Sequence, residues 1–301
     1  MIQEVLMSKY GDYVLMTDST CDLSPEFAEK YDLTVMPMAF LMQDKVYNHY
    51  LDCREMTLAI FYNNLKKGIL SQTTQISYNS YLNFFETILK EGKDIIYVCF
   101  SSGLSGTFNT SRIAARDIIE KYPERKITII DSKCASVGEG LLMYYTALKY
   151  KDDKPEMDEL AEYVESLKMN VCHWFVVDDI EHLKRGGRIS AVTATFAKAL
   201  QIKPMLSLDG DGKLVNVGKV RGANNVYDAL IKKMQRDGYD YKNQTVIVAH
   251  ADNIDGAKEL RKRVKSFVKD ALILDIGPII GTHVGTGMLA LAFTGERNIN
   301  M

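Results

Sequence analysis

Apolar runs alternate with amphipathic segments through the first half of the chain. Residues 94–100 are apolar, β-branched and aromatic, which predicts a buried strand. Apolar side chains then recur at helical spacing from Phe108 to Tyr122, which predicts a helix. Further strands are predicted at 13–17, 34–41 and 126–130, and further helices at 56–65, 81–89, 139–150 and 158–167. This alternation is typical of a parallel sheet covered by helices.

Hydroxyl-rich loops follow several of these strands. Residues 101–107 hold four hydroxyls and two glycines, and Ser19-Thr20 and Asp131-Ser132 follow two other strands. Parallel strands place such loops along one edge, where helix N-termini offer unpaired N–H groups to an anion. Each loop alone is typical of a capped helix, but three at one edge favour an anion site. Residues 70–77 form a further polar segment before a helix.

The pattern changes near residue 171. Strands are predicted at 173–177, 205–208, 214–220, 245–250 and 272–276. The turn at 209–212 joins two of them as a hairpin, which predicts a mixed sheet. A glycine-rich turn at 281–287 holds His283 before a last apolar strand. We therefore expect an α/β domain with a parallel sheet over residues 1–170 and an α+β domain with a mixed sheet over residues 171–301.

Composition narrows the class of protein. The 301 residues are 47% hydrophobic and 25% charged, with a net charge of −2. The chain has no apolar run of membrane-spanning length and no signal peptide pattern at its start, so a cytoplasmic protein is expected. Nucleic acid is not an expected partner, because basic runs are absent. The five cysteines are scattered and predict reduced thiols rather than a metal site.

Six motifs, in order, resemble the DegV family of bacterial lipid-binding proteins. They are DST at 18–20, TTQIS at 73–77, SSGLSGT at 101–107, LKRGGRI at 183–189, IKP at 202–204 and HVGTG at 283–287. The resemblance covers nearly the whole chain. It implies an α/β domain joined to an α+β domain, with a long-chain fatty acid held between them.

The resemblance also implies roles for particular residues. The fatty acid carboxylate would be bound at Thr73 and Ser102, with Thr74 and Ser101 beside them in the same loops, and His283 would support this network. The chemistry agrees, because hydroxyls can hold a carboxylate without locking it in an ion pair. Burial of an 18-carbon tail, at roughly 0.8 kcal/mol per CH₂, would contribute about 10 kcal/mol before ordering costs.

Characterised members of that family are acyl-carrying subunits of a bacterial fatty acid kinase. The resemblance therefore implies a chain that is not itself an enzyme and that presents its fatty acid to a separate ATP-binding subunit. No cofactor is implied beyond the bound lipid, and peripheral membrane contact would serve lipid exchange. Arg185 and Arg188 would contact the partner or a phosphate, although a solvated basic turn is an equally simple interpretation.

Two departures from the family pattern affect these expectations. Thr74 and Ile76 stand where the family has serine and proline, and Thr286 stands where it has a second proline. The first change keeps a hydroxyl beside Thr73. The last alters the turn that follows His283.

Two other functions stay open. A Ser/His lipid ester hydrolase would use Ser102 or Ser105 as nucleophile and His283 as base, but the sequence lacks GxSxG and an evident acidic third member. A generic anion-binding α/β module would explain the loops but not a long apolar surface in the second domain. A nucleotide kinase is disfavoured, because neither GxxxxGK[ST] nor GxGxxG occurs.

Overall fold

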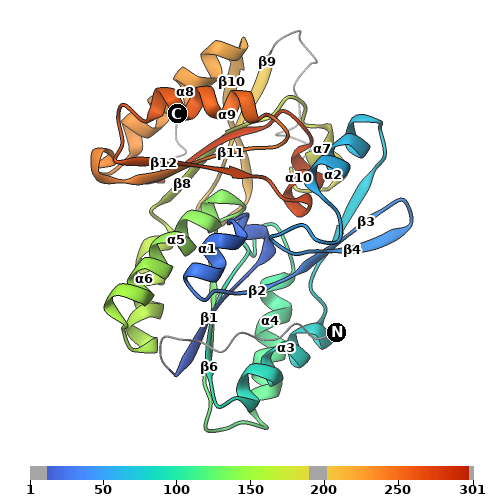
Figure 1. The fold of residues 1–301 in the computed structure, drawn as a ribbon, viewed down its shortest axis with the longest axis vertical. Coiled ribbons are helices and arrows are strands. Elements are labelled where there is room, and N and C mark those ends of the chain that lie inside the picture. The colour runs from blue at the N-terminus through green and yellow to red at the C-terminus, as the bar shows by residue number, and fades with distance from the viewer. Residues whose placement is uncertain (1–11, 190–201, 298–301) are drawn as a thin grey trace.

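The computed structural model describes residues 12–189 and 202–297. Figure 1 shows two halves, each built of sheet and helices, with the N-terminal half below and the C-terminal half above. The predicted combination of an α/β half with a parallel sheet and an α+β half with a mixed sheet is confirmed.

The first sheet has four parallel strands. Its order is β2 (Thr34–Met36), β1 (Tyr13–Asp18), β6 (Asp94–Cys99) and β7 (Ile127–Asp131). Figure 1 shows α3 (Tyr78–Lys90) and α4 (Thr107–Ile119) on one flank, and α5 (Val137–Asp153) and α6 (Met157–Lys168) on the other. The short elements η1 (Ser19–Cys21) and α1 (Pro25–Lys30) follow β1. The loops after β1, β6 and β7 lie at the carboxyl edge, as predicted.

A small antiparallel sheet lies beside the first and was not predicted. Its order is β4 (Lys45–His49), β3 (Met38–Met42) and β5 (Ser71–Thr74). The predicted strand 34–41 is therefore two strands in different sheets, broken at Pro37, which has no N–H for a ladder. Residues 45–49 and 71–74, expected in connections, are strands whose polar composition hides them. Helix α2 (Leu58–Lys66) joins β4 to β5.

The third sheet forms the C-terminal half. Its order is β10 (Leu214–Arg221), β9 (Ile202–Leu208), β8 (Val171–Val176), β13 (Leu289–Thr294), β11 (Thr245–His250) and β12 (Asp270–Asp275). Strands β11 and β12 run parallel and the other neighbours antiparallel. Helices α8 (Ala223–Asp237) and α9 (Ile254–Val264) cover one face. The shorter α7 (Glu181–Arg185), η2 (Tyr241–Asn243) and α10 (Pro278–Val284) complete the half.

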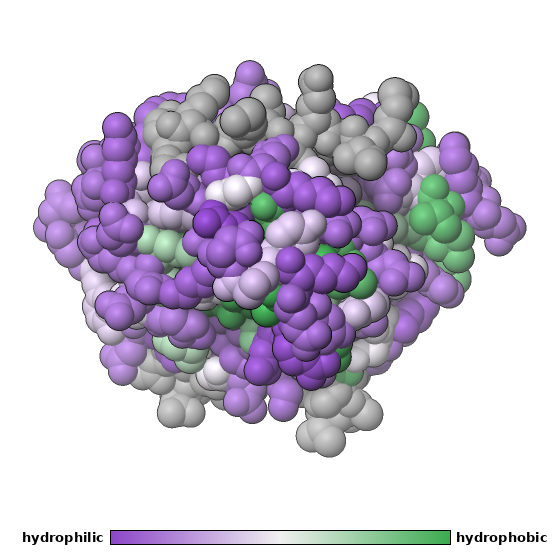
Figure 2. Space-filling model, turned by 90° about the horizontal axis from the view of Figure 1, so that it is seen from below, coloured by the Kyte–Doolittle hydropathy of each residue, from purple (hydrophilic) through white to green (hydrophobic). Residues whose placement is uncertain are grey.

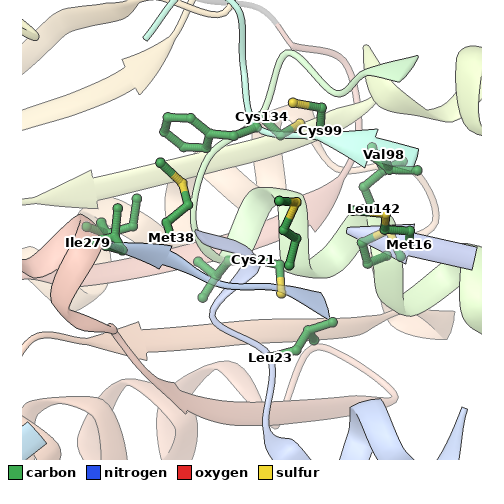
Figure 3. Packing of buried hydrophobic residues seen from close by; sticks show 14 of the residues in the cluster. Met16, Cys21, Leu23, Met38, Val98, Cys99, Cys134, Leu142 and Ile279 are labelled. Carbon is green, nitrogen blue, oxygen red and sulfur yellow. The ribbon is translucent and has the colours of Figure 1, made fainter. Parts of the chain in front are cut away.

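One hydrophobic core runs across the two halves. Figure 3 shows Met38 of β3, Cys134 and Ile279 of α10 packed in the same cluster. A second, smaller core lies between the third sheet and its helices α8 and α9. Four of the five cysteines are buried, and all five are free thiols, as expected from their spacing. The two halves are thus joined by apolar packing.

The surface is mostly polar. Figure 2 views the molecule from below Figure 1 and shows a largely hydrophilic face with small separate hydrophobic patches. Among the described helices, none is both long enough and apolar enough to cross a bilayer.

Helix α10 connects the C-terminal half to the N-terminal elements. Gly277 N–H, at its N-cap, donates to Asp22 (2.9 Å). The Thr282 hydroxyl donates to the Pro278 carbonyl (2.7 Å), and its oxygen lies 2.9 Å from the Ser71 hydroxyl of β5. His283 was expected in a glycine-rich turn, but it lies in the last turn of this helix, since Pro278 at the first position starts the helix and Gly285, at φ +70°, ends it.

Candidate functional site

The carboxyl edge of the first sheet is held together by a buried carboxylate. Asp18 Oδ2 accepts from the Phe100 N–H (3.1 Å) and the Tyr97 hydroxyl (2.9 Å), so the ends of β1 and β6 are tied. Ser19 and Thr20 also serve the scaffold: Ser19 accepts from Met38 N–H (3.0 Å), and Thr20 is buried against Asp18. The loop after β1 therefore holds the neighbouring strands together at the carboxyl edge of the first sheet.

A cavity lies between the first and third sheets, beside that edge. Its volume is about 70 Å³, below the roughly 300–1,000 Å³ typical of small-molecule sites, so its side chains must move apart to admit a long ligand. Most of its wall is apolar, including Phe100, Phe175, Leu183, Leu208 and Met288. Polar side chains join this wall from β5, from the loop before α4 and from α10. The cavity therefore combines a long apolar surface with a polar region.

The polar region brings together residues far apart in the sequence. Thr73 Oγ1 lies 2.9 Å from His283 Nε2, although 210 positions separate the two residues. Thr73 is on β5, whose register pairs it with Phe40 of β3, and His283 is on α10, which packs against β3 and β5. Of the expected network of Thr73, Ser102 and His283, the structure therefore brings Thr73 and His283 together.

The imidazole of His283 is neutral near pH 7. Burial, aided by the charge of Arg188 and by His182, lowers its pKa to about 4. Its Nδ1 has no hydrogen-bond partner among the described residues. A Cβ on Gly186 would stand 2.1 Å from this Nδ1. The backbone of Gly186, which is the C-cap of α7, therefore packs directly against the ring. Within the described part of the chain, His283 can hold a hydrogen bond through Nε2, but no acidic side chain bonds to its Nδ1 to orient it as a base.

The serines after β6 point in different directions. Ser105 lines the cavity, and its hydroxyl lies 2.8 Å from that of Thr107 at the start of α4. Ser101 is buried and donates to the Gly212 carbonyl (2.9 Å) in the β9–β10 turn. Ser102 is exposed and accepts from Lys133 Nζ (2.9 Å). Of these three serines, the structure places Ser105 at the cavity.

The two arginines of the RGGR segment also differ. Arg185 is exposed on α7. Arg188 is half-buried, lines the cavity and donates from Nε to the Leu104 carbonyl (3.0 Å). The guanidinium of Arg188 therefore adds a positive charge to the polar region, which sequence reasoning expected to contain neutral donors only.

The departures from the family motifs fall at separate places. Thr74 lines the cavity mouth, and its hydroxyl donates to the Ala39 carbonyl (3.3 Å). Ile76 is buried, so the apolar character of the family proline is kept. Thr286 lies away from the cavity, on a separate polar pocket lined also by Asp178 and Asn253.

The described residues contain no group of three or more His, Cys, Asp or Glu side chains that could hold a metal ion. Sequence reasoning missed three cavity residues: Ser105 as a ligand-facing hydroxyl, Gln75 beside it, and His173 of β8. Gln75 approaches the start of α4, since a Cβ on Gly106 would meet its Oε1 at 2.4 Å. The signal for Ser105 was its place just before a helix, where its hydroxyl accepts from the Thr107 N–H (3.2 Å).

Comparisons with known proteins agree with this architecture. A family model described as an uncharacterised protein of the DegV family matches residues 13–296. A DegV domain-containing protein of Clostridium perfringens is 39% identical over 286 residues, 94% of this chain and 98% of the relative. A DegV domain-containing protein of Lactococcus lactis is 33% identical, covering 93% and 96%.

Solved structures show the same fold. A DegV lipid-binding protein from Thermotoga maritima superposes with a TM-score of 0.84 at 25% identity, over 96% of this chain and 100% of that one. A fatty acid-binding DegV family protein from Streptococcus agalactiae superposes with a TM-score of 0.79 at 26% identity, over 94% and 98%.

Proposed function

Because this chain belongs to the DegV family, we propose that it binds a long-chain fatty acid in the cavity between its first and third sheets. The observation that carries the proposal is the pairing of Thr73 with His283 at one region of an otherwise apolar cavity. That combination matches a molecule with one carboxylate and a long apolar tail. Solved relatives with this fold carry the description of lipid- or fatty acid-binding proteins.

The carboxylate is assigned to Thr73, Ser105 and His283, with Arg188 beside them. Thr73 and Ser105 supply hydroxyl donors, and a neutral His283 supplies one N–H. The Arg188 charge offsets that of the carboxylate, while its Nε stays engaged with Leu104. Such a site orients the headgroup, and burial of the tail supplies most of the affinity.

The Ser/His hydrolase is the weaker alternative. The hydrogen bond of His283 goes to Thr73, and its Nδ1 lacks the acidic partner that orients a catalytic base. A pKa near 4 also makes this imidazole a poor base at neutral pH. A binding protein without turnover of its own fits these features better.

We extend the proposal to presentation of the bound carboxylate to a separate ATP-binding kinase subunit, which forms the acyl phosphate. In support, the exposed cations Lys184 and Arg185 lie on α7, which packs against α10 beside the polar region. Exposed cations next to a reacting carboxylate suit docking of a partner or its phosphates. This role implies a cytoplasmic location, where ATP is available, and transient membrane contact for lipid exchange.

Lipid analysis of the purified protein tests the binding proposal. Protein purified from bacteria should carry one long-chain fatty acid per chain by native mass spectrometry. Thr73→Ala and Ser105→Ala should each reduce retention, and together less than additively, because both donors serve one carboxylate. Ser102→Ala is the matched control and should retain lipid; strong loss there would move the carboxylate to Ser102. Protein that never carries or takes up fatty acid would refute the proposal.

Kinase presentation has a separate test. With a cognate kinase and ATP, Arg185→Ala should leave bound lipid unchanged and lower acyl phosphate formation about tenfold or more. Lys232→Ala, which removes an exposed cation on α8, is the control and should change neither quantity. Normal acyl phosphate formation by Arg185→Ala would remove this arginine from the partner surface.

A further inference from the structure

A polar side chain lies within the apolar part of the cavity, away from the carboxylate site. His173 is on β8, is 4% exposed and lines the cavity. Phe175 lies two residues further along the same face of the strand. It is about 7 Å nearer to α7 and to the carboxylate region. Leu208 and Leu214 lie with His173 on the cavity wall, on the two strands that meet at the β9–β10 turn.

The imidazole of His173 has no proper hydrogen-bond partner. Neither ring nitrogen is paired within the described residues. The Val171 backbone acts to raise the pKa of His173, but it makes no hydrogen bond of normal geometry with the ring. The main-chain carbonyl of His173 is already used, since it accepts from the Ser207 hydroxyl (3.1 Å). Buried polar groups are nearly always paired, so this side chain requires an explanation.

The first turn of α5 holds the ring in place. A Cβ on Gly138 would stand 2.5 Å from His173 Nδ1, so glycine leaves the space that the imidazole fills. The N-cap residue of α5, Ser136, makes no side-chain capping bond to this helix. Through Gly138 the positive end of this 17-residue helix adjoins the imidazole, and that end favours an electron-rich atom such as a ligand oxygen.

The ring stays neutral over the physiological range. Burial and the nearby charge of Arg297 place the pKa of His173 well below its usual value. A neutral imidazole has one N–H donor and one acceptor nitrogen, and a hydroxyl group complements both. A water molecule is a poor substitute, because an ordered buried water needs two to four polar partners and the neighbouring wall is apolar.

We propose that the cavity selects long-chain fatty acids that carry a hydroxyl group within the chain, and that His173 hydrogen-bonds to this hydroxyl. The inference rests on the proposed fatty acid site and specifies its ligand. An unsubstituted tail would leave the imidazole buried and unpaired, whereas a hydroxyl at the depth of His173 pairs it. His173 then determines specificity at a point remote from the carboxylate.

Affinities for positional isomers test this assignment. Delipidated protein is titrated with octadecanoic acid and with hydroxyoctadecanoic acids whose hydroxyl stands at successive positions along the chain. The isomers all pay the same cost to remove the hydroxyl from water. Differences in their affinities therefore arise from contacts with the protein. One interior position should bind about tenfold tighter than the other isomers. His173→Leu should remove that preference and leave octadecanoic acid bound as well or better.

Two variants serve as controls. Leu208→Val alters the same wall without touching a polar group, so it should weaken all the acids by a similar factor and keep the preferred position. His173→Gln keeps a donor and an acceptor and should keep part of the preference. If His173→Leu does not fold, imidazole ¹⁵N shifts of the wild-type protein replace it, and they should respond to the preferred isomer and not to octadecanoic acid.

The outcomes separate this inference from the proposed function. Equal affinities for all isomers, with normal binding of octadecanoic acid, would refute the role of His173 alone. A positional preference that persists in His173→Leu would do the same. Failure of every acid to bind would refute the fatty acid site and this inference together.

Discussion

His283 shows how one residue separates a carrier from a catalyst. Its Nε2 is 2.9 Å from Thr73, and its pKa of about 4 keeps the ring neutral. If the ring only supports the carboxylate, His283→Gln should keep much of the fatty acid affinity, because glutamine retains a donor and an acceptor. His283→Ala should lose about tenfold. Binding titrations with octadecanoic acid measure both.

An assay with acyl esters distinguishes the alternative. Wild-type protein should release no free acid above the buffer rate, because the Nδ1 of His283 has no orienting partner among the described residues. Ester turnover that disappears in His283→Gln would contradict the carrier role, since glutamine cannot accept a proton at neutral pH.

Asp22 should make stability depend on pH. Burial raises the pKa of Asp22 to about 7, with hydrogen bonds from Ser136 and Gly277 opposing the shift and Asp275 and Asp18 adding to it. Between pH 4 and 7 the folded state holds this proton and the unfolded state does not, so stability falls as pH rises. Each pH unit costs at most about 1.4 kcal/mol.

Asp22→Asn removes this titration while keeping an acceptor for Gly277. The free energy of unfolding of the variant, from urea titrations at several pH values, should fall less steeply with pH than that of the wild type. The difference between the two slopes isolates Asp22 from Asp18 and Glu139, whose pKa values burial also raises. Parallel slopes would show that Asp22 does not titrate in this range.

At the residue scale, the family resemblance put Thr73, Ser102 and His283 in one network around the carboxylate, and the structure brings Thr73 and His283 together. It could not predict that Ser105, rather than Ser102, faces the cavity. Side-chain direction in a short loop depends on which backbone groups each hydroxyl must satisfy, and Ser101 and Ser102 are engaged by Gly212 and Lys133. Those partners lie in segments far away in sequence.

Among the secondary-structure elements, α7 and α10 meet at a close backbone contact that offers a sharp test. Gly186→Ala would put a Cβ 2.1 Å from His283 Nδ1, so the imidazole must move away from Thr73. We expect fatty acid affinity to fall about tenfold or more. Gly187→Ala is the matched control, because nothing lies within 4 Å of its added Cβ, although its φ of +66° makes alanine costly.

The control variant should lose roughly 1 kcal/mol of stability and keep its affinity. Thermal unfolding and fatty acid titration of both variants separate the two effects. Equal affinity losses would show that the segment as a whole, and not the contact with His283, controls the site.

Alternating strands and helices were predictable, because buried parallel strands are continuous apolar runs. The sheet formed by β3, β4 and β5 was not predictable by that rule. Strand β5 is Ser-Gln-Thr-Thr, with alternately half-buried and exposed residues, so its sequence is that of a polar loop. It forms a strand because β3 pairs with it and α10 packs against it. The Thr282 and Ser71 hydroxyls form one hydrogen bond in this contact. Thr73 is consequently held on a strand, which fixes its hydroxyl more rigidly than a loop would.

For the whole molecule, the cavity lies where two sheets share one core, so a ligand there contacts both halves. The residues just before α10 add direct ties: the Gly277 N–H donates to Asp22, and the Ile276 carbonyl accepts from the Tyr62 hydroxyl (2.7 Å). A bound fatty acid should therefore stabilise the protein as one unit. The two-part sequence pattern predicted both halves but not this joint, because the joint depends on contacts between them.

Chain length provides the test at this scale. Each CH₂ that enters the cavity should add roughly 0.8 kcal/mol, and the gain should stop when the cavity is full. Ala290, on β13 opposite Phe175, is 1% exposed and lines the wall. Ala290→Leu adds about three carbons of side chain inside the same space. The longest saturated acid that still raises the melting temperature should then shorten by about two to three carbons, with shorter acids bound as before. Ala257→Leu, in the separate core under α9, would lower the melting temperature without ligand yet leave the chain-length limit unchanged. An unchanged limit in Ala290→Leu would place the tail outside the cavity between the sheets.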